Sequence, residues 1–430
     1  MGETNSCFNR TQSSISLFDL KPPGAFPACI DQSFAYETTR ELEFAVAIVK
    51  ELSAAFPISG VLLTGSFARG EGIIRRSRNE RGSQWLSDLE CLVVIPDSAR
   101  THLRMISDAL AERTRIANEE DQQKSRGQHI ELSPILTARL RTMKPSIFAY
   151  ELIEHGKLLW RSGGHEVPMP PRFELSRTVL GRDALRLLNN RIMEQVAAST
   201  HCSEQQDPAE TAYLQSKFWV EMGTSISVFL ECYQSSYKAR YEALENVVAD
   251  ANLLPLPFGN ATLSTILRAM RARVAPDGCR ATGPSGDTDC AAALALKIWW
   301  WETANILNTS PLVGDWSEIG ARLRRTDTTD SRLRDWGRVL LRKGIGGNFT
   351  IASIASVLQA GSLGSAIYTA GCLLFFYREA ISQNSVVGAE IYQRLRSFLG
   401  INPPAGAVAH RCFSEVTALA WQKHLRSTAL

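Results

Sequence analysis

Val61-Leu-Leu-Thr-Gly-Ser-Phe-Ala-Arg-Gly-Glu-Gly72, followed after a basic loop by Ser87-Asp-Leu-Glu-Cys-Leu-Val-Val-Ile95, is the most informative part of this 430-residue chain. Its first segment is a short apolar run that ends in Gly65-Ser66. This pattern is typical of a buried strand that breaks into a turn. Because glycine has no side chain, the backbone amides of such a turn can approach a phosphate group closely. The segment therefore predicts a phosphate-binding turn.

The second segment alternates as a strand does, with Asp88 and Glu90 on one side and Leu89 and Cys91 on the other. Two carboxylates on one strand face repel each other, and their burial is favourable only if a cation lies between them. Oxygen ligands favour Mg²⁺ or Mn²⁺, and Mg²⁺ is usually held by one or two carboxylates together with substrate phosphates. The two segments together predict a metal–nucleotide site and phosphoryl or nucleotidyl transfer.

Gly65-Ser66 followed by Asp88-Leu89-Glu90 resembles the signature of the nucleotidyltransferase superfamily that includes DNA polymerase beta, over roughly residues 40–165. The resemblance implies an α+β protein, in which a small mixed-sheet nucleotidyltransferase domain precedes a larger α-helical region. It also implies that Gly65 and Ser66 hold the triphosphate while Asp88 and Glu90 bind two metal ions. The spacer before Asp88 is longer than usual in that family and indicates an inserted loop, residues 73–84, whose charges we interpret as a solvated cluster.

The same resemblance implies a third acid on a later strand. Residues 128–135 indicate a short strand ended by Pro134, because proline cannot donate a hydrogen bond to a sheet, and Glu131 is the only acid in it. Glu131 would ligate the catalytic metal and help to deprotonate the attacking hydroxyl. The alternative is an ordinary exposed strand acid. Arg69, beside the turn, has two interpretations as well: a phosphate contact or an ion pair with Glu71.

Composition and charge set broader limits. The chain is 44% hydrophobic and 21% charged with a net charge of +3, which suits a protein of two or three domains and implies no polyanionic partner. Nine cysteines without a Cys-x-x-Cys pair indicate free thiols and a cytoplasmic location, and no signal-peptide core is present at the N-terminus. The apolar run over residues 351–377 is broken by polar residues and glycines, so we expect two buried helices there and no membrane span.

Gly163-Gly164 and the prolines that follow predict the main boundary. We expect an N-terminal arm over 1–35, the catalytic domain over 36–165, a helical domain over 166–310 and a C-terminal helical region over 311–430. Residues 211–243 indicate one long helix that carries Lys217. The resemblance implies a lysine from a helical domain that neutralises the triphosphate, and Lys217 is our candidate, with a solvated lysine as the alternative. Trp299-Trp300-Trp301 is expected to pack in the core.

The sequence thus predicts Mg²⁺-dependent transfer of a nucleoside monophosphate from a nucleoside triphosphate, with ATP as the expected donor, to an acceptor hydroxyl, with release of pyrophosphate. The acceptor is expected to be a small molecule, a second nucleotide or a protein hydroxyl, and a nucleic acid is disfavoured at a net charge of +3. If Glu131 is not the third acid, the alternative is a catalytically inactive nucleotide-binding or scaffold protein of the same fold.

Overall fold

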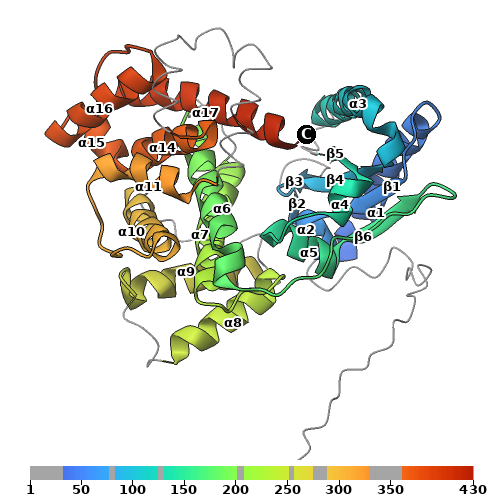
Figure 1. Cartoon of the computed structure of the whole chain (residues 1–430), viewed down its shortest axis with the longest axis horizontal. Coiled ribbons are helices and arrows are strands. Elements are labelled where there is room, and N and C mark those ends of the chain that lie inside the picture. Colours follow the sequence, from blue (N-terminus) through green and yellow to red (C-terminus); the bar gives the residue numbers. More distant parts are fainter. Residues whose placement is uncertain are drawn as a thin grey trace, which may run out of the picture.

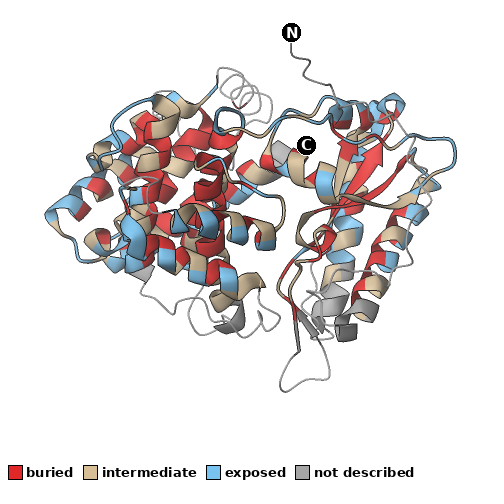
Figure 2. Cartoon of the chain, turned by 90° about the horizontal axis from the view of Figure 1, so that it is seen from below, coloured by how far each residue is buried: buried red, intermediate tan, exposed pale blue. Residues whose placement is uncertain are grey.

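The computed structural model describes residues 32–76, 83–123, 130–200, 208–250, 256–274, 288–328, 335 and 361–429. These residues form a mixed α+β protein with two lobes, which lie side by side in Figure 1. The sheet lobe comprises residues 32–161 and the helical lobe residues 177–429, joined by an irregular segment that contains the predicted Gly163-Gly164 boundary. Each lobe has its own buried interior, which is red in Figure 2.

A four-stranded mixed sheet forms the centre of the sheet lobe. Its strands are β1 (Gly60–Leu63), β4 (Leu89–Ile95), β5 (Ile130–Leu136) and β6 (Lys157–Arg161), in the spatial order β5-β4-β1-β6. Strand β1 is antiparallel to β4 and β6, whereas β4 and β5 are parallel. The described ends of the predicted inserted loop, β2 (Ile74–Arg76) and β3 (Ser83–Trp85), pair as an antiparallel hairpin, and residues 77–82 lie outside the described residues.

Helices cover both faces of this sheet, as the alternation of β4 requires. Helices α1 (Gln32–Ser53) and α3 (Leu103–Gln123) pack on the face that carries Leu89, Cys91 and Val93. Helices α4 (Thr137–Arg141) and α5 (Ile147–His155) pack on the opposite face, against Leu92 and Val94. The remaining short elements are α2 (Gly65–Ala68), directly after β1, and the 3-10 helix η1 (Asp97–His102) after β4.

The helical lobe is a bundle with one large hydrophobic cluster and smaller ones beside it among the described residues. Its helices within the described ranges are α6 (Arg177–Ala198), α7 (Pro208–Phe229), α8 (Tyr237–Ala249), α9 (Gly259–Val274), α10 (Thr288–Leu307), η2 (Trp316–Glu318), α11 (Ile319–Thr326), α14 (Leu363–Phe376), α15 (Arg378–Ser382), α16 (Val386–Leu399) and α17 (Ala407–Ala429). Buried residues from α6 at one end of the chain segment and from α17 at the other belong to the same cluster. The core therefore crosses the boundary expected at residue 310.

Two expectations about secondary structure are wrong. Strand β5 continues through Pro134 to Leu136, since β5 is an edge strand and an edge strand tolerates a proline whose missing donor faces away from the sheet. The long helix expected over 211–243 is two helices, α7 and α8. The chain reverses between them through Glu231, which has a left-handed φ of 56°, and Ser236 caps α8 by accepting a hydrogen bond from the Ala239 amide.

The core of the helical lobe confirms the interpretation of the tryptophan run. Trp299 and Trp300 are fully buried, and Trp301 packs against Phe229 and Phe258. Beside them lies Glu302, which is 0% exposed and has the Ser225 hydroxyl as a polar neighbour. Burial raises the pKa of Glu302 to about 8. Glu302 is thus an acid that the fold favours in its neutral form.

None of the described helices combines the length and apolar character that a membrane crossing requires. The second half of the broken apolar run forms the buried helix α14, and residues 351–360 lie outside the described residues. Cys91, Cys232, Cys290, Cys372 and Cys412 are free thiols, and Cys91 and Cys372 are buried.

Candidate functional site

The turn after β1 lies against the Glu90 carboxylate. Gly65 has a left-handed φ of +67°, and a Cβ atom at this position would lie 2.3 Å from Glu90 Oε2. Thr64 ties the same two segments together, since its amide donates to the Glu90 carbonyl at 2.9 Å. Only glycine fits here, both for its backbone conformation and for the space that Glu90 occupies. The structure thus brings the predicted turn and the second predicted acid into direct contact.

The three predicted acids lie on one edge of the sheet lobe, which we call the acid edge: Asp88, Glu90 and Glu131. Asp88 immediately precedes β4, and Glu131 is the register partner of Glu90 on the parallel strand β5. Side chains of register partners project from the same sheet face, so these two carboxylates are neighbours. Asp88 and Glu131 are exposed, Glu90 is half-buried, and Glu131 accepts a hydrogen bond from Ser133 at 3.1 Å.

The electrostatics of the acid edge are dominated by burial and like charges. Burial, followed by the charges of Glu131 and Asp88, raises the pKa of Glu90 to about 7, against smaller opposing effects of Lys217 and Arg69. Beyond the effect of burial, the negative charges of Glu131 and Asp88 outweigh the positive charges of Lys217 and Arg69 at this point. An added cation at the acid edge would lower the pKa of Glu90.

The donors of the acid edge are carboxylate oxygens, the ligands that Mg²⁺ and Mn²⁺ prefer. Within the described residues, no group of three or more His, Cys, Asp or Glu side chains is arranged to hold a metal ion. The acid edge is therefore not a closed ligand cage. Its chemistry suits a hard cation whose remaining ligands come from water and from substrate phosphates.

Helix α7 of the helical lobe presents one face to this site. Tyr213 and Lys217 are four residues apart and so lie on the same side of the helix. The Tyr213 hydroxyl is 3.3 Å from Ser87 Oγ, directly beside Asp88. Lys217 Nζ is 5.9 Å from the centre of the Tyr213 ring and 3.7 Å from Glu194 Oε1. Lys217, the lysine predicted from the resemblance, is thus within electrostatic reach of Glu90.

A second cation from the helical lobe, Arg273 at the end of α9, lies beside the turn. Its Nη2 donates to the Glu71 carbonyl at 3.1 Å, and its guanidinium is 5.8 Å from the Tyr213 ring centre. Its Nη1 is buried and has no hydrogen-bond partner among the described residues. Lys217 and Arg273, which we call the basic pair, therefore share Tyr213 as a common neighbour. Nothing local in the sequence distinguishes Arg273 from the other arginines of α9.

The guanidinium of Arg69 is paired with two carboxylates that do not belong to the acid edge. Its side chain is 6% exposed, its Nε donates to Glu71 at 2.8 Å, and its Nη1 donates to Glu151 of α5. The pairing with Glu71, one of the two interpretations from the sequence, is therefore present, and Glu151 is a partner that the sequence did not indicate. Ser66 has a backbone role in the same turn, because its carbonyl accepts the Glu71 amide at 2.8 Å.

Comparison of the chain with protein-family models, with curated proteins and with solved structures finds no match. Its function is therefore inferred from the geometry of its own residues and from the short signature around Gly65 and Asp88. Three features of that geometry carry chemistry: a glycine turn, a carboxylate-rich sheet edge against it, and two cations from another lobe beside it.

Proposed function

We propose that the protein is a nucleotidyltransferase that moves a nucleoside monophosphate, with ATP as the expected donor, to an acceptor hydroxyl and releases pyrophosphate. The observation that carries this proposal is the contact between the left-handed Gly65 and the Glu90 carboxylate, with Glu131 in register beside it. This contact joins a turn suited to phosphate with acids suited to a hard cation. The resemblance of Gly65-Ser66 and Asp88-Leu89-Glu90 to the nucleotidyltransferase signature supports the same proposal.

The triphosphate is proposed to lie between the turn and the basic pair. The bare backbone of Gly65 and Ser66 would approach phosphate oxygens from one side. Lys217 and Arg273 would offset their charge from the other, and the buried, unpartnered Nη1 of Arg273 offers a donor for an oxygen acceptor. A buried N–H without a partner is costly, so a ligand oxygen there would be strongly favoured.

Asp88, Glu90 and Glu131 would hold Mg²⁺ or Mn²⁺, which supplies charge neutralisation at the phosphates and a lower pKa for the acceptor hydroxyl. In the proposed reaction the acceptor oxygen attacks the α-phosphorus, the bond between the α-phosphorus and the bridging oxygen breaks, and pyrophosphate leaves. Glu131, which is exposed, would take the hydroxyl proton. The protein contributes mainly position and charge compensation, as is usual for phosphoryl transfer.

The acceptor class follows from charge. With a net charge of +3 the chain has little excess charge for a nucleic acid, so a small molecule or a protein hydroxyl is the proposed acceptor. The competing function is an inactive nucleotide-binding protein of the same fold, which is favoured by the open arrangement of acids at the sheet edge in the described structure.

Label transfer and pyrophosphate release from each α-³²P nucleoside triphosphate, with Mg²⁺ or Mn²⁺, test the proposal. The double variant Asp88→Ala/Glu90→Ala is compared with Asp108→Ala/Glu112→Ala, which removes two exposed acids from α3. We expect metal-dependent transfer by the wild type and the control, and a loss of at least about a thousandfold in the acid-edge variant. Nucleotide binding without turnover for all acceptors tried supports the inactive alternative. No nucleotide binding by the wild type overturns both.

A further inference from the structure

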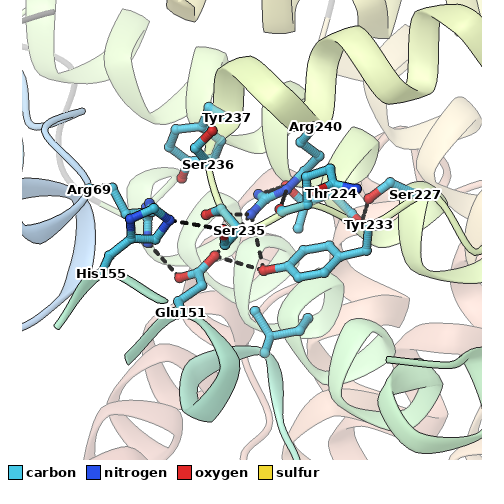
Figure 3. Close-up of polar contacts among 12 residues, drawn as sticks. Arg69, Glu151, His155, Thr224, Ser227, Tyr233, Ser235, Ser236, Tyr237 and Arg240 are labelled. Atoms are coloured by element: carbon cyan, nitrogen blue, oxygen red, sulfur yellow. Dashed lines mark hydrogen bonds and ion pairs between the residues drawn. The ribbon is translucent and has the colours of Figure 1, made fainter. Parts of the chain in front are cut away.

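Two carboxylates of the sheet lobe, Glu71 and Glu151, each bind both lobes at once. One oxygen of each accepts a hydrogen bond from Arg69, which lies in the sheet lobe. The other oxygen of Glu71 accepts the Tyr237 amide at 2.6 Å, and the other oxygen of Glu151 accepts the Tyr233 hydroxyl at 2.8 Å. Figure 3 shows Glu151 between Arg69 on one side and Tyr233 and Arg240 on the other.

Arg240 fixes the helical-lobe end of this network. It is 1% exposed, and it donates to Glu151 Oε1 at 2.9 Å, to Thr224 Oγ1 at 2.7 Å and to the Gln234 carbonyl at 2.8 Å. Its guanidinium also lies 4.5 Å from the centre of the Tyr233 ring. These contacts hold Arg240 to α7 and to the chain reversal before α8. We call the whole set the latch: Arg69, Glu71, Glu151, Tyr233, Tyr237 and Arg240.

At its other end the latch is joined to the Gly65-Ser66 turn through Arg69, the residue that directly follows helix α2. Helix α2 has only four residues, Gly65–Ala68, and Thr64 before it makes no side-chain capping bond. Arg69 is the residue that ends α2, and its amide donates to the Gly65 carbonyl at 3.3 Å. A helix this short has little stability of its own, so contacts from outside determine its position.

We propose that Glu151 is a positioning residue, which holds the Gly65-Ser66 turn at a fixed distance from Lys217 and Arg273 by way of Arg69. This inference rests on the proposed function, because it takes the spacing between the turn and the basic pair to match the length of a bound triphosphate. Glu151 itself contacts neither the turn nor the basic pair in any hydrogen bond or ion pair of the described residues. It acts through Arg69 on one side and through Arg240 and Tyr233 on the other.

The balance of charge explains why Glu151 suits this role. Burial alone would lower the pKa of Arg69, but Glu151, Tyr237 and Glu71 raise it above its ordinary value, so the guanidinium remains charged inside the protein. Charged hydrogen bonds are stronger and more directional than neutral ones. A glutamine at position 151 keeps the size of the side chain. It loses the charge and one acceptor, so Arg69 would no longer be held from both sides.

The test compares Glu151→Gln with Glu154→Gln, the same substitution at an exposed position of the same helix. Tyr233→Phe is the second variant, because it removes only the hydroxyl that donates to Glu151 and conserves the buried ring. Hydrogen exchange of the amides in residues 61–72 is measured in the nucleotide-free proteins. Steady-state kinetics with ATP, Mg²⁺ and the acceptor found by label transfer give KM and kcat separately.

We expect exchange at the amides of residues 69–71 to be about tenfold faster in Glu151→Gln than in Glu154→Gln, with a smaller change in Tyr233→Phe. We expect KM for ATP to rise by about tenfold while kcat changes little, as for a loss of positioning before the chemical step. Arg69→Lys should also show faster exchange and a higher KM for ATP than the wild type, because a lysine cannot reach two carboxylates as the guanidinium fork does.

Exchange and KM values equal to those of Glu154→Gln in both Glu151→Gln and Tyr233→Phe would overturn the inference and leave the proposed function intact. Absence of nucleotide binding by the wild type would instead overturn the proposed function. The exchange measurement needs no nucleotide, so the two failures are distinguishable. A fall in kcat alone would also contradict a positioning role, because it would place Glu151 in the chemical step.

Discussion

The acid edge and the latch are both rich in glutamate and lie at opposite ends of the same short turn, yet their charges are arranged in opposite ways. In the latch, Glu71 and Glu151 each use both oxygens on donors, and two arginines offset their charge. At the acid edge, Glu131 and Asp88 lie near Glu90 and help to raise its pKa to about 7. Charges that offset each other connect the lobes in the latch, whereas the acid edge, where negative charges gather, is where we propose that a cation binds.

The largest expected loss of stability is that of removing one positive charge from the latch. Arg240→Met keeps a long side chain but leaves the half-buried Glu151 without one of its cations, and we expect the free energy of unfolding to fall by about 3 kcal/mol. Urea denaturation followed by circular dichroism measures this change. Arg104→Met, at a side chain that is 93% exposed, is the control and should change the stability by less than about 0.5 kcal/mol. Equal effects of the two variants would show that the latch does not stabilise the protein.

Glu302 adds a third case to the comparison between the acid edge and the latch. Burial raises its pKa, and no cation or like charge is among the causes of that rise. Its pKa in the folded protein is about 8, above its ordinary value of 4.5, so the unfolded chain ionises first as the pH rises. The stability that it contributes is complete below about pH 4.5 and is lost progressively up to about pH 8. We expect Glu302→Gln to exceed the wild type by about 4 kcal/mol at pH 9 and to match it near pH 4.

The measurement for Glu302 is thermal unfolding across this pH range, with the exposed Glu390→Gln as the control. A parallel pH dependence of the wild type and Glu302→Gln would show that Glu302 is ionised at neutral pH in the folded protein. In that case a buried cation or water must compensate it.

A substitution at the acid edge should act on stability in the direction opposite to one in the latch. The folded pKa of Glu90, about 7, lies above 4.5, so its contribution to stability falls between these two pH values. We expect Glu90→Gln to be more stable than the wild type by about 2 kcal/mol at pH 8 and equal to it near pH 4. Calorimetry at both pH values is the measurement. Destabilisation at pH 8 would indicate that Glu90 is already compensated by the protein.

The smallest expected effect is that of the cation itself. At pH 8 and low ionic strength, millimolar Mg²⁺ should stabilise the wild type by about 1 kcal/mol through binding at the acid edge. The Tm of Glu90→Gln should respond much less. An identical Mg²⁺ response in both proteins would place the cation elsewhere.

Local patterns were sufficient to predict the turn and the strand that follows it. The run before Gly65 and the alternation from Asp88 to Ile95 are decided by neighbours in the sequence, and the structure contains both β1 and β4. The resemblance led to Glu131 as the candidate third acid, since it is the single acid of its predicted strand, and its register with Glu90 follows once β5 lies parallel to β4. The mixed α+β class follows from the same strands and from the helical periodicity beyond residue 176.

The partners across the lobe boundary were not predictable in this way. Arg273 lies 202 residues from Glu71, and Arg240 lies 89 residues from Glu151, so no local spacing connects them. In the sequence alone, a half-buried glutamate on a helix, such as Glu151, resembles a solvated one until the opposite surface is known. The break between α7 and α8 was also missed, because apolar residues continue across it while Glu231 takes a left-handed conformation.

The distances along the chain between the Gly65-Ser66 turn and its neighbours in the helical lobe have a consequence for synthesis on the ribosome. The glycine turn is complete as sequence by residue 72, but its partners Tyr237 and Arg273 emerge much later. A nascent chain that ends after the sheet lobe contains Asp88 and Glu90, but it lacks the helical-lobe donors Tyr237 and Arg273, which bind Glu71 at the end of the turn. We therefore expect the contacts of the turn to be complete only when α9 has been translated, and a sheet-lobe fragment to be a poor substitute for the whole chain.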